Sequence, residues 1–201
     1  MKFAKIILYL FPIAFTLNVC DCGDPLIQKG WELNRQGIEL LSSNPEKALR
    51  KFSAAQELIP DIPDFPTNAG LAYVNLSKNK EALEKFAEAI EIDPKYIQAY
   101  YNQGIIFEKL GNHRSAIESY TKALQIAPDM PDIVYNIGLA YENSGNKRLA
   151  IKNYIHFIEI AYTSDETNIN DAKIRIEKLS REESDLTTGK SSKDRKKFSF
   201  P

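Results

Sequence analysis

The segment IQAYYNQGIIFEKLGNHRSAIESYTKALQIAPDM, residues 97–130, decides the fold of this chain. Apolar residues between Ala116 and Leu124 stand at i, i+1, i+4, i+7 and i+8, which places them on one stripe of an α-helix. Gly111, followed by asparagine, is typical of a turn. Pro128 has no amide hydrogen to donate and ends the second helix. The segment therefore predicts a hairpin of two helices.

Residue types from this segment return at a constant interval along most of the chain. Six registers keep the same step: Ala48, Ala82, Ala116 and Ala150; Phe52, Phe86, Tyr120 and Tyr154; Ala55, Ala89 and Ala123; Pro60, Pro94 and Pro128; Gly70, Gly104 and Gly138; Tyr73, Phe107 and Tyr141. A single period shared by six registers indicates an array of similar units. Small residues let the helices approach closely, and the aromatic rings fill the space between hairpins.

This pattern resembles the tetratricopeptide repeat, a 34-residue unit of two antiparallel helices. That family places glycine and an aromatic residue in the first helix, then alanine, an aromatic residue, alanine and proline through the second. The resemblance covers Leu26 to Tyr162. It implies an all-α superhelix, a solenoid of about four helical hairpins followed by a C-terminal capping helix. The expected units are 25–62, 63–96, 97–130 and 131–164.

The first and fourth units depart from the pattern. The spacing from Gly37 to Ala48 is one residue shorter than the matching gap in later units, so a different turn is expected there. Trp31 stands two residues ahead of the position where the family prefers tryptophan. In the fourth unit Phe157 replaces a small alanine, which predicts that this unit ends differently.

Two segments follow the array. Residues 167–180 carry an amphipathic helix that we expect to cap the last hairpin, covering Ile155, Phe157 and Ile158; docking on another protein is the alternative. Its apolar residues step by three, four and three: Ile169, Ala172, Ile176 and Leu179. Residues 181–201 are rich in polar and charged residues and are expected to form a disordered tail. The basic end of this tail either keeps it solvated or contacts an acidic surface.

The segment 1–22 has the layout of a secretory signal. Lys2 and Lys5 precede an uncharged, mostly apolar run from Ile6 to Val19, which is short for a membrane-spanning helix. The alternative is an N-terminal helix buried in the fold. The signal predicts an exported protein of the bacterial cell envelope.

The sequence LNVC, which ends at Cys20, resembles the lipobox of bacterial lipoproteins. The resemblance implies that Cys20 receives a diacylglycerol and becomes the new N-terminus. Leu17 matches the family pattern, whereas Val19 departs from it, because a smaller residue is usual before the cysteine. The alternative is ordinary cleavage after Cys22, which would leave the protein periplasmic or secreted without a lipid.

The composition and motifs argue against several functions. The formal net charge of −1 does not favour a nucleic-acid partner, which needs a basic face. The two histidines, His113 and His156, have no cysteine or carboxylate at metal-ligand spacing. The sequence shows neither a phosphate-binding glycine loop nor a nucleophile elbow. We therefore predict no enzyme activity, no metal and no cofactor.

The resemblance also implies a concave surface, lined by the first helices, that binds a peptide or protein segment. The sixth position of the unit is asparagine three times, and the fifth position is tyrosine twice. The predicted peptide-binding residues are Asn68, Asn102, Asn136, Tyr101 and Tyr135. Asparagine can pair with the backbone of an extended peptide of any sequence. The alternative is that these residues only stabilise the helices.

One subtype of the family clamps a C-terminal carboxylate with lysine and asparagine at the fifth and ninth positions. This chain has Thr67, Tyr101 and Tyr135 at the fifth position and Leu71, Ile105 and Leu139 at the ninth. That clamp is absent, and the apolar ninth position favours an apolar or amphipathic ligand.

Three functional hypotheses follow. The leading one is a non-enzymatic adaptor of the cell envelope that binds a protein or peptide and is held at the membrane through Cys20 if that residue is lipidated. The second is a structural envelope protein that associates with itself. The third, least favoured, is an envelope enzyme with an unrecognised site.

Overall fold

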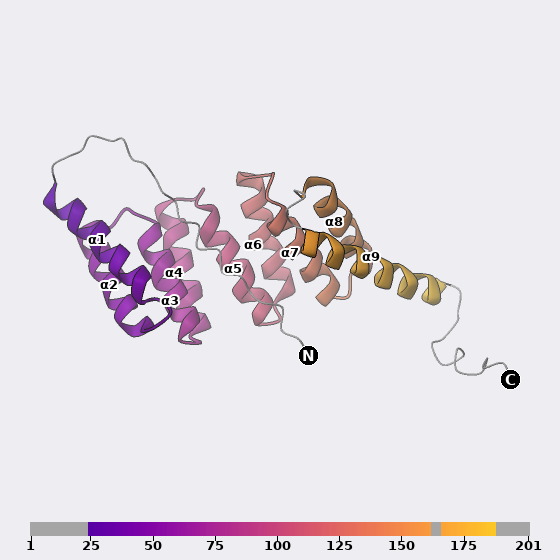
Figure 1. Ribbon diagram of the computed structural model, residues 1–201, viewed down its shortest axis with the longest axis horizontal. Coiled ribbons are helices and arrows are strands. Elements are labelled where there is room, and N and C mark those ends of the chain that lie inside the picture. The colour runs from indigo at the N-terminus through magenta and orange to yellow at the C-terminus, as the bar shows by residue number, and fades with distance from the viewer. Residues whose placement is uncertain (1–23, 162–165, 188–201) are drawn as a thin grey trace.

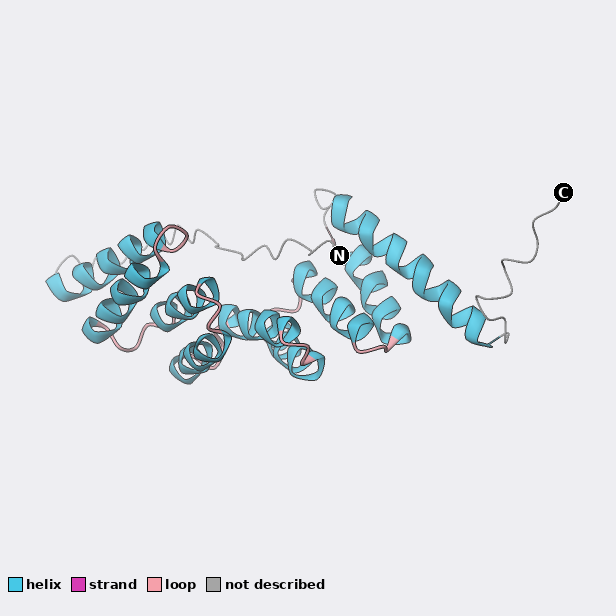
Figure 2. Ribbon diagram, turned by 90° about the horizontal axis from the view of Figure 1, so that it is seen from below, coloured by secondary structure: helices cyan, strands magenta, loops and turns pink. Residues whose placement is uncertain are grey.

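Helix pairs stacked along an arc make up the molecule (Figures 1 and 2). The computed structural model describes residues 24–161 and 166–187, and within these ranges it has nine helices and no strand. They are α1 (Pro25–Leu40), α2 (Pro45–Leu58), α3 (Asp64–Asn75), α4 (Asn79–Ile92), α5 (Ile97–Lys109), α6 (His113–Ile126), α7 (Pro131–Asn143), α8 (Lys147–Ile160) and α9 (Glu166–Thr187). The predicted all-α array of hairpins is confirmed.

Each hairpin closes where a glycine of its first helix meets an aromatic ring of its second. At Gly104 an added Cβ would lie 2.3 Å from Cε1 of Tyr120, and at Gly70 it would lie 2.5 Å from Cε1 of Phe86. Only a residue without a side chain allows this approach of the two helices. The rings are buried as a result, with Phe86 fully inaccessible. The recurring glycine and aromatic positions of the sequence therefore form one contact, repeated in each hairpin.

The core extends along the whole array as three clusters of buried side chains. Second helices pack against the following first helices, as α2 does on α3, α4 on α5 and α6 on α7. The alanines that recur at the repeat interval in the second helices have no exposed surface: Ala48, Ala55, Ala82, Ala89, Ala116, Ala123 and Ala150. These small side chains allow close packing, so each hairpin is stabilised by its neighbours.

The turn inside the first hairpin differs from the later turns. Gly111 and Gly145 adopt φ of 75° and 82° between the paired helices of the third and fourth hairpins, and Ser77 adopts φ of 59° in the second. The first hairpin has no such residue; there, the backbone N–H of Asn44 donates to the carbonyl of Leu40 at 2.7 Å. The expected difference in this turn is confirmed.

Helix α9 closes the C-terminal end of the array. Ala172 is fully buried and Leu179 is 2% exposed, and both pack in one cluster with Phe157 and Ile158. Ile155, in contrast, is 45% exposed, so the expectation that α9 covers it was wrong. Ile155 directly follows the buried Tyr154 and stands two residues before the buried Phe157, and its own side chain points away from both.

The predicted end of the capping helix was also wrong, because α9 continues past residue 180 to Thr187. Ion pairs hold these last turns: Arg181 contacts Glu177 at 2.6 Å, and Lys147 of α8 contacts Glu182 at 2.8 Å. The first seven residues of the segment expected to be a disordered tail, 181–187, are therefore helical. Residues 188–201, the predicted signal at 1–22 and Cys20 lie outside the described residues.

Candidate functional site

The predicted peptide-binding residues lie on the first helices of three hairpins. Asn68 is on α3, Tyr101 and Asn102 are on α5, and Tyr135 and Asn136 are on α7. Side-chain hydrogen bonds connect α1 with α3 and α5 with α7, so these helices are neighbours. We call the surface formed by α1, α3, α5 and α7 the first-helix face.

The asparagines bond to the neighbouring hairpin. Asn68 donates through Nδ2 to Oδ1 of Asn34 at 2.9 Å, and Asn136 donates through Nδ2 to the hydroxyl of Tyr101 at 3.1 Å. Asn102 is only 7% exposed. These contacts link α1 to α3 and α5 to α7. Peptide binding by this set stays a prediction, and the structure adds a stabilising role for Asn68 and Asn136.

Tyr135 connects the first-helix face to the capping helix. Its hydroxyl donates to the Asp171 carboxylate on α9. Its ring lies edge-on to Phe157, with ring centroids 5.1 Å apart, and tilted against Tyr154 at 5.6 Å. Burial, together with the hydrogen bond to Asp171, raises the pKa of Tyr135 to about 12, so it stays a neutral donor. Tyr135 therefore anchors α9.

A network of charged groups surrounds this anchor. Glu142 accepts from the Tyr154 hydroxyl at 2.8 Å and from Nη1 of Arg175 at 2.9 Å. Arg175 also donates from Nε to Asp171 at 2.5 Å. Burial alone would raise the pKa of Asp171, but hydrogen bonds from Tyr135 and Arg175 bring it below its ordinary value. Asp171 therefore stays ionised, and α9 is held by ion pairs as well as by apolar contact.

Outside this network, the described residues offer few groups arranged to bind a metal ion or a small ligand. They contain no group of three or more histidine, cysteine, aspartate or glutamate residues placed to hold a metal ion. His113 faces Glu108, with Nδ1 and Oε2 2.9 Å apart, and is the first residue of α6. An open depression of about 440 Å³ lies between α2 and α4 and is lined by Gln56, Pro60, Asp61, Glu88, Glu91 and Ile92. Its polar lining already pairs internally, because Gln56 donates to Glu88 at 2.6 Å.

Comparison with known families agrees with this architecture. Models of the tetratricopeptide repeat match residues 97–130 and 131–163, and a further model described as TPR repeat matches residues 70–111. The chain is a tetratricopeptide repeat protein. These matches begin at residue 70, after the first hairpin with its atypical turn. No curated protein matches the chain significantly.

Solved structures share the fold of this tetratricopeptide repeat protein. A crystal structure of MamA protein is 26% identical with a TM-score of 0.60, covering 65% of this chain and 72% of that one. A second crystal structure of MamA is 24% identical with a TM-score of 0.58, covering 76% and 81%. The first TPR of Spaghetti (RPAP3), bound to an HSP90 peptide, is 21% identical with a TM-score of 0.56, covering 59% and 94%.

Sequence reasoning missed residues on α1, the first helix of this repeat protein. Asn34 pairs with Asn68, and Trp31 and Ile38 are 38% and 40% exposed on the same helix. Asn34 stands one full 34-residue repeat before Asn68, and this spacing could have revealed that the two asparagines are equivalent. Gly37, however, stands one residue closer than a full repeat to its equivalent, Gly70, so the register of α1 was ambiguous.

The apolar ninth position of the repeat is exposed unevenly. Leu71 and Ile105 are only 6% and 8% exposed, whereas Ile38, which follows Gly37 as Leu71 follows Gly70, is 40% exposed. Leu71 and Ile105, on the two middle first helices, therefore belong to the core. Accessible aliphatic surface on the first-helix face is concentrated on α1, and a ligand that seeks apolar contact would meet it there.

Proposed function

We propose that this tetratricopeptide repeat protein is an adaptor of the cell envelope that binds an apolar segment of a partner protein on its first-helix face. The repeats make the chain a scaffold for protein–protein interaction. The partner class and the cellular location are our proposals.

The exposed Ile38 on α1 is the observation that carries the ligand proposal. It lies on the same face as the half-buried polar side chains Asn68 and Tyr101. A segment lying across this face could place an apolar side chain on Ile38 and its backbone against the polar row. The RPAP3 domain binds an HSP90 peptide, which supports peptide binding by a domain of this fold.

The expected ligand is not a carboxylate tail. The positions that resemble a carboxylate clamp carry Thr67, Tyr101 and Tyr135 in place of lysine, and Leu71, Ile105 and Leu139 in place of asparagine. These side chains offer no cation to a terminal carboxylate. An apolar or amphipathic segment fits them better.

The test is a matched pair of substitutions. Ile38→Ser removes the exposed side chain of the first-helix face, and Ile155→Ser removes a side chain of the same type that is 45% exposed on α8. Partners captured from native envelope by each variant are quantified by mass spectrometry against the unchanged protein. We expect Ile38→Ser to lower recovery of the principal partner roughly tenfold or more, as for an interface hot spot. Equal recovery with both variants would contradict the assignment.

The location is tested separately by the mass of the mature N-terminus. A diacylglycerol-modified Cys20 would support a lipid anchor, and a free N-terminus after Cys22 would support secretion without one. A mature protein that keeps residues 1–22 in a cytoplasmic fraction would contradict the envelope proposal.

Self-association is the second candidate function. Exposed aliphatic side chains lie near both ends of the array: Leu26, 53% exposed on α1, and Ile174, 56% exposed on α9. Contacts between ends would join copies of the chain head to tail. Sedimentation over a wide concentration range tests this, and a strict monomer throughout would remove the candidate.

A further inference from the structure

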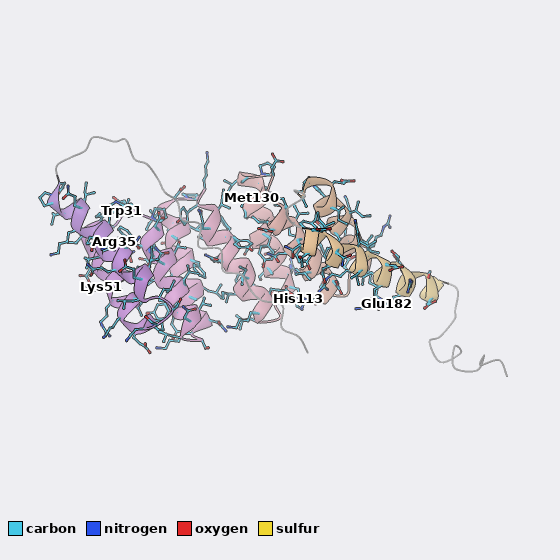
Figure 3. All side chains as sticks on the ribbon, in the orientation of Figure 1. Trp31, Arg35, Lys51, His113, Met130 and Glu182 are labelled. Atoms are coloured by element: carbon cyan, nitrogen blue, oxygen red, sulfur yellow. The ribbon has the colours of Figure 1, made fainter. Side chains whose placement is uncertain are left out.

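Three exposed apolar side chains gather at the start of the array. Leu26, Ile27 and Trp31 lie in the first two turns of α1 and are 53%, 39% and 38% exposed. We call these three residues the apolar tip. Figure 3 shows Trp31 at the α1 end of the array and Glu182 at the opposite end, on α9.

The apolar tip stands on a well-formed helix. Asp24 caps α1 by accepting a hydrogen bond from the Leu26 amide at 2.8 Å, and Pro25 occupies the first turn. Trp31 rests edge-on against the buried ring of Phe65, with ring centroids 5.2 Å apart. The tip is therefore held in place by α1 and α3, ready to contact another surface.

Packing within the array covers Trp31 only in part and leaves Leu26 and Ile27 exposed. The side of α1 that is buried in the array presents Gly30, Asn34 and Gly37. Gly37 receives the ring of Phe52. Apolar side chains outside such a packed face cost free energy in water unless something covers them.

The chain before the tip indicates what covers it. Cys20, the predicted lipidation site, stands six residues before Leu26, a span of at most about 20 Å of extended chain. The apolar run of residues 6–19 comes directly before this cysteine. Attachment to a membrane at either feature would hold the apolar tip close to the lipid surface.

We infer that the apolar tip docks onto the lipid bilayer, with Trp31 at the level of the headgroups. This inference rests on the proposed envelope location. Tryptophan favours the boundary between water and hydrocarbon, because its ring is apolar and its indole N–H seeks a polar partner. Leucine and isoleucine at a helix start can enter the outermost acyl region.

Docking would fix the orientation of the adaptor. Helices α1 and α9 lie at opposite ends of the array (Figure 1), so a molecule seated on α1 would project α9 away from the bilayer. The diacylglycerol predicted at Cys20 would bring two acyl chains to the bilayer, which is enough for stable attachment. The tip would add a contact that restricts the tilt of the array.

The single tryptophan makes the test direct, since Trp31 is the only one in the chain. The full-length chain is reconstituted into vesicles of phosphatidylethanolamine and phosphatidylglycerol, with and without lipids brominated close to the headgroup. We expect brominated lipid to quench at least half of the Trp31 emission, and iodide in the water to quench little. Free access of iodide with no quenching by brominated lipid would overturn the inference.

Two variants keep the probe while changing the tip. Leu26→Ser/Ile27→Ser removes the neighbours of Trp31, and Leu110→Ser changes a leucine of equal exposure, 53%, at the end of α5. We expect the double variant to lose at least half of the bromolipid quenching and Leu110→Ser to lose none. Circular dichroism confirms that each variant is folded. Equal quenching in all three proteins would overturn the inference.

The remaining outcomes separate this inference from the proposed function. If the chain floats with the vesicles but Trp31 stays open to iodide, the anchor stands and tip docking is wrong. If the chain does not float, membrane attachment and tip docking are both wrong, while the envelope location is decided separately by the mature N-terminus. If shielding of Trp31 rises with protein concentration and is insensitive to bromine, a second copy covers the tip and lipid docking is wrong.

Discussion

The two ends of the array differ in how much apolar surface they leave exposed. At the C-terminal end, α9 buries Ala172 and Leu179 against the last hairpin and joins it through the paired charges of Glu142 and Arg175. At the N-terminal end, α1 leaves Trp31 and its apolar neighbours exposed. A stack of hairpins must cover its last apolar surface to remain soluble. The closed end therefore serves stability, and the open end is available for contact.

Removal of α9 should have the largest effect on the stability of the closed end. A chain that stops after Ala161 would expose Val134 and Phe157, which are buried in the cluster shared with α9. We expect the free energy of unfolding to fall by roughly 3–6 kcal/mol, since each large apolar side chain contributes about 1.5–3 kcal/mol. Urea unfolding measures the loss. A chain that stops after Thr187 is the control, and an unchanged urea midpoint after removal of α9 would contradict its capping role.

The charge network at the closed end gives the next largest effect. Arg175→Ala leaves Glu142 and Asp171 without their shared partner in a partly buried setting, and we expect a loss of about 1–3 kcal/mol. Arg181→Ala removes only a surface pair with Glu177 and should change stability little. Thermal unfolding of both variants measures the two losses of stability. Equal losses would mean that the network adds nothing beyond an ordinary surface pair.

Acid should loosen the closed end through Asp171. Its pKa lies below the ordinary 3.8 in the folded protein, so its stabilising contribution is present above that pH and is lost as the pH falls through the folded-state pKa. Asp171→Asn should therefore cost stability near neutral pH and flatten the decline in stability below about pH 4. Urea unfolding at a series of pH values measures this. Parallel pH profiles for the two proteins would contradict the assignment.

The open end should show the smallest effect on folding. Leu26→Ser/Ile27→Ser changes side chains that already face water, so we expect the free energy of unfolding to shift by less than about 0.5 kcal/mol. The same variant should lose lipid contact, which separates its surface role from stability. Thermal unfolding without vesicles is the measurement. A loss of more than about 2 kcal/mol would show that the tip belongs to the core.

The hairpins could be predicted because their determinants are local and repeat. Gly104 with Tyr120 forms one contact of two residue types, and the same step recurs along the chain. The length of α9 could not be predicted in this way. Its last turns are polar, and they are held in part by Lys147 from another helix, which pairs with Glu182. Composition alone suggested a tail there.

The candidate site was harder to predict than the fold. Asn68 and Asn136 were chosen because asparagine can pair with a peptide backbone, yet their amide groups donate to Asn34 and Tyr101 of the preceding hairpin. Which partner a side chain takes depends on the offset between stacked helices, and the repeat period does not contain that offset. The exposure of Trp31 likewise depends on how α1 sits against α3.

Amide hydrogen exchange of the full-length chain, with and without vesicles, tests the difference between the two ends most directly. We predict that residues 170–180 of α9 are protected as strongly as α7 and α8 in both conditions, because α9 is packed against α8. The first two turns of α1 should gain protection only when vesicles are present. Exchange of residues 170–180 at the rate of an unfolded peptide, or no change in α1 on vesicles, would contradict the account.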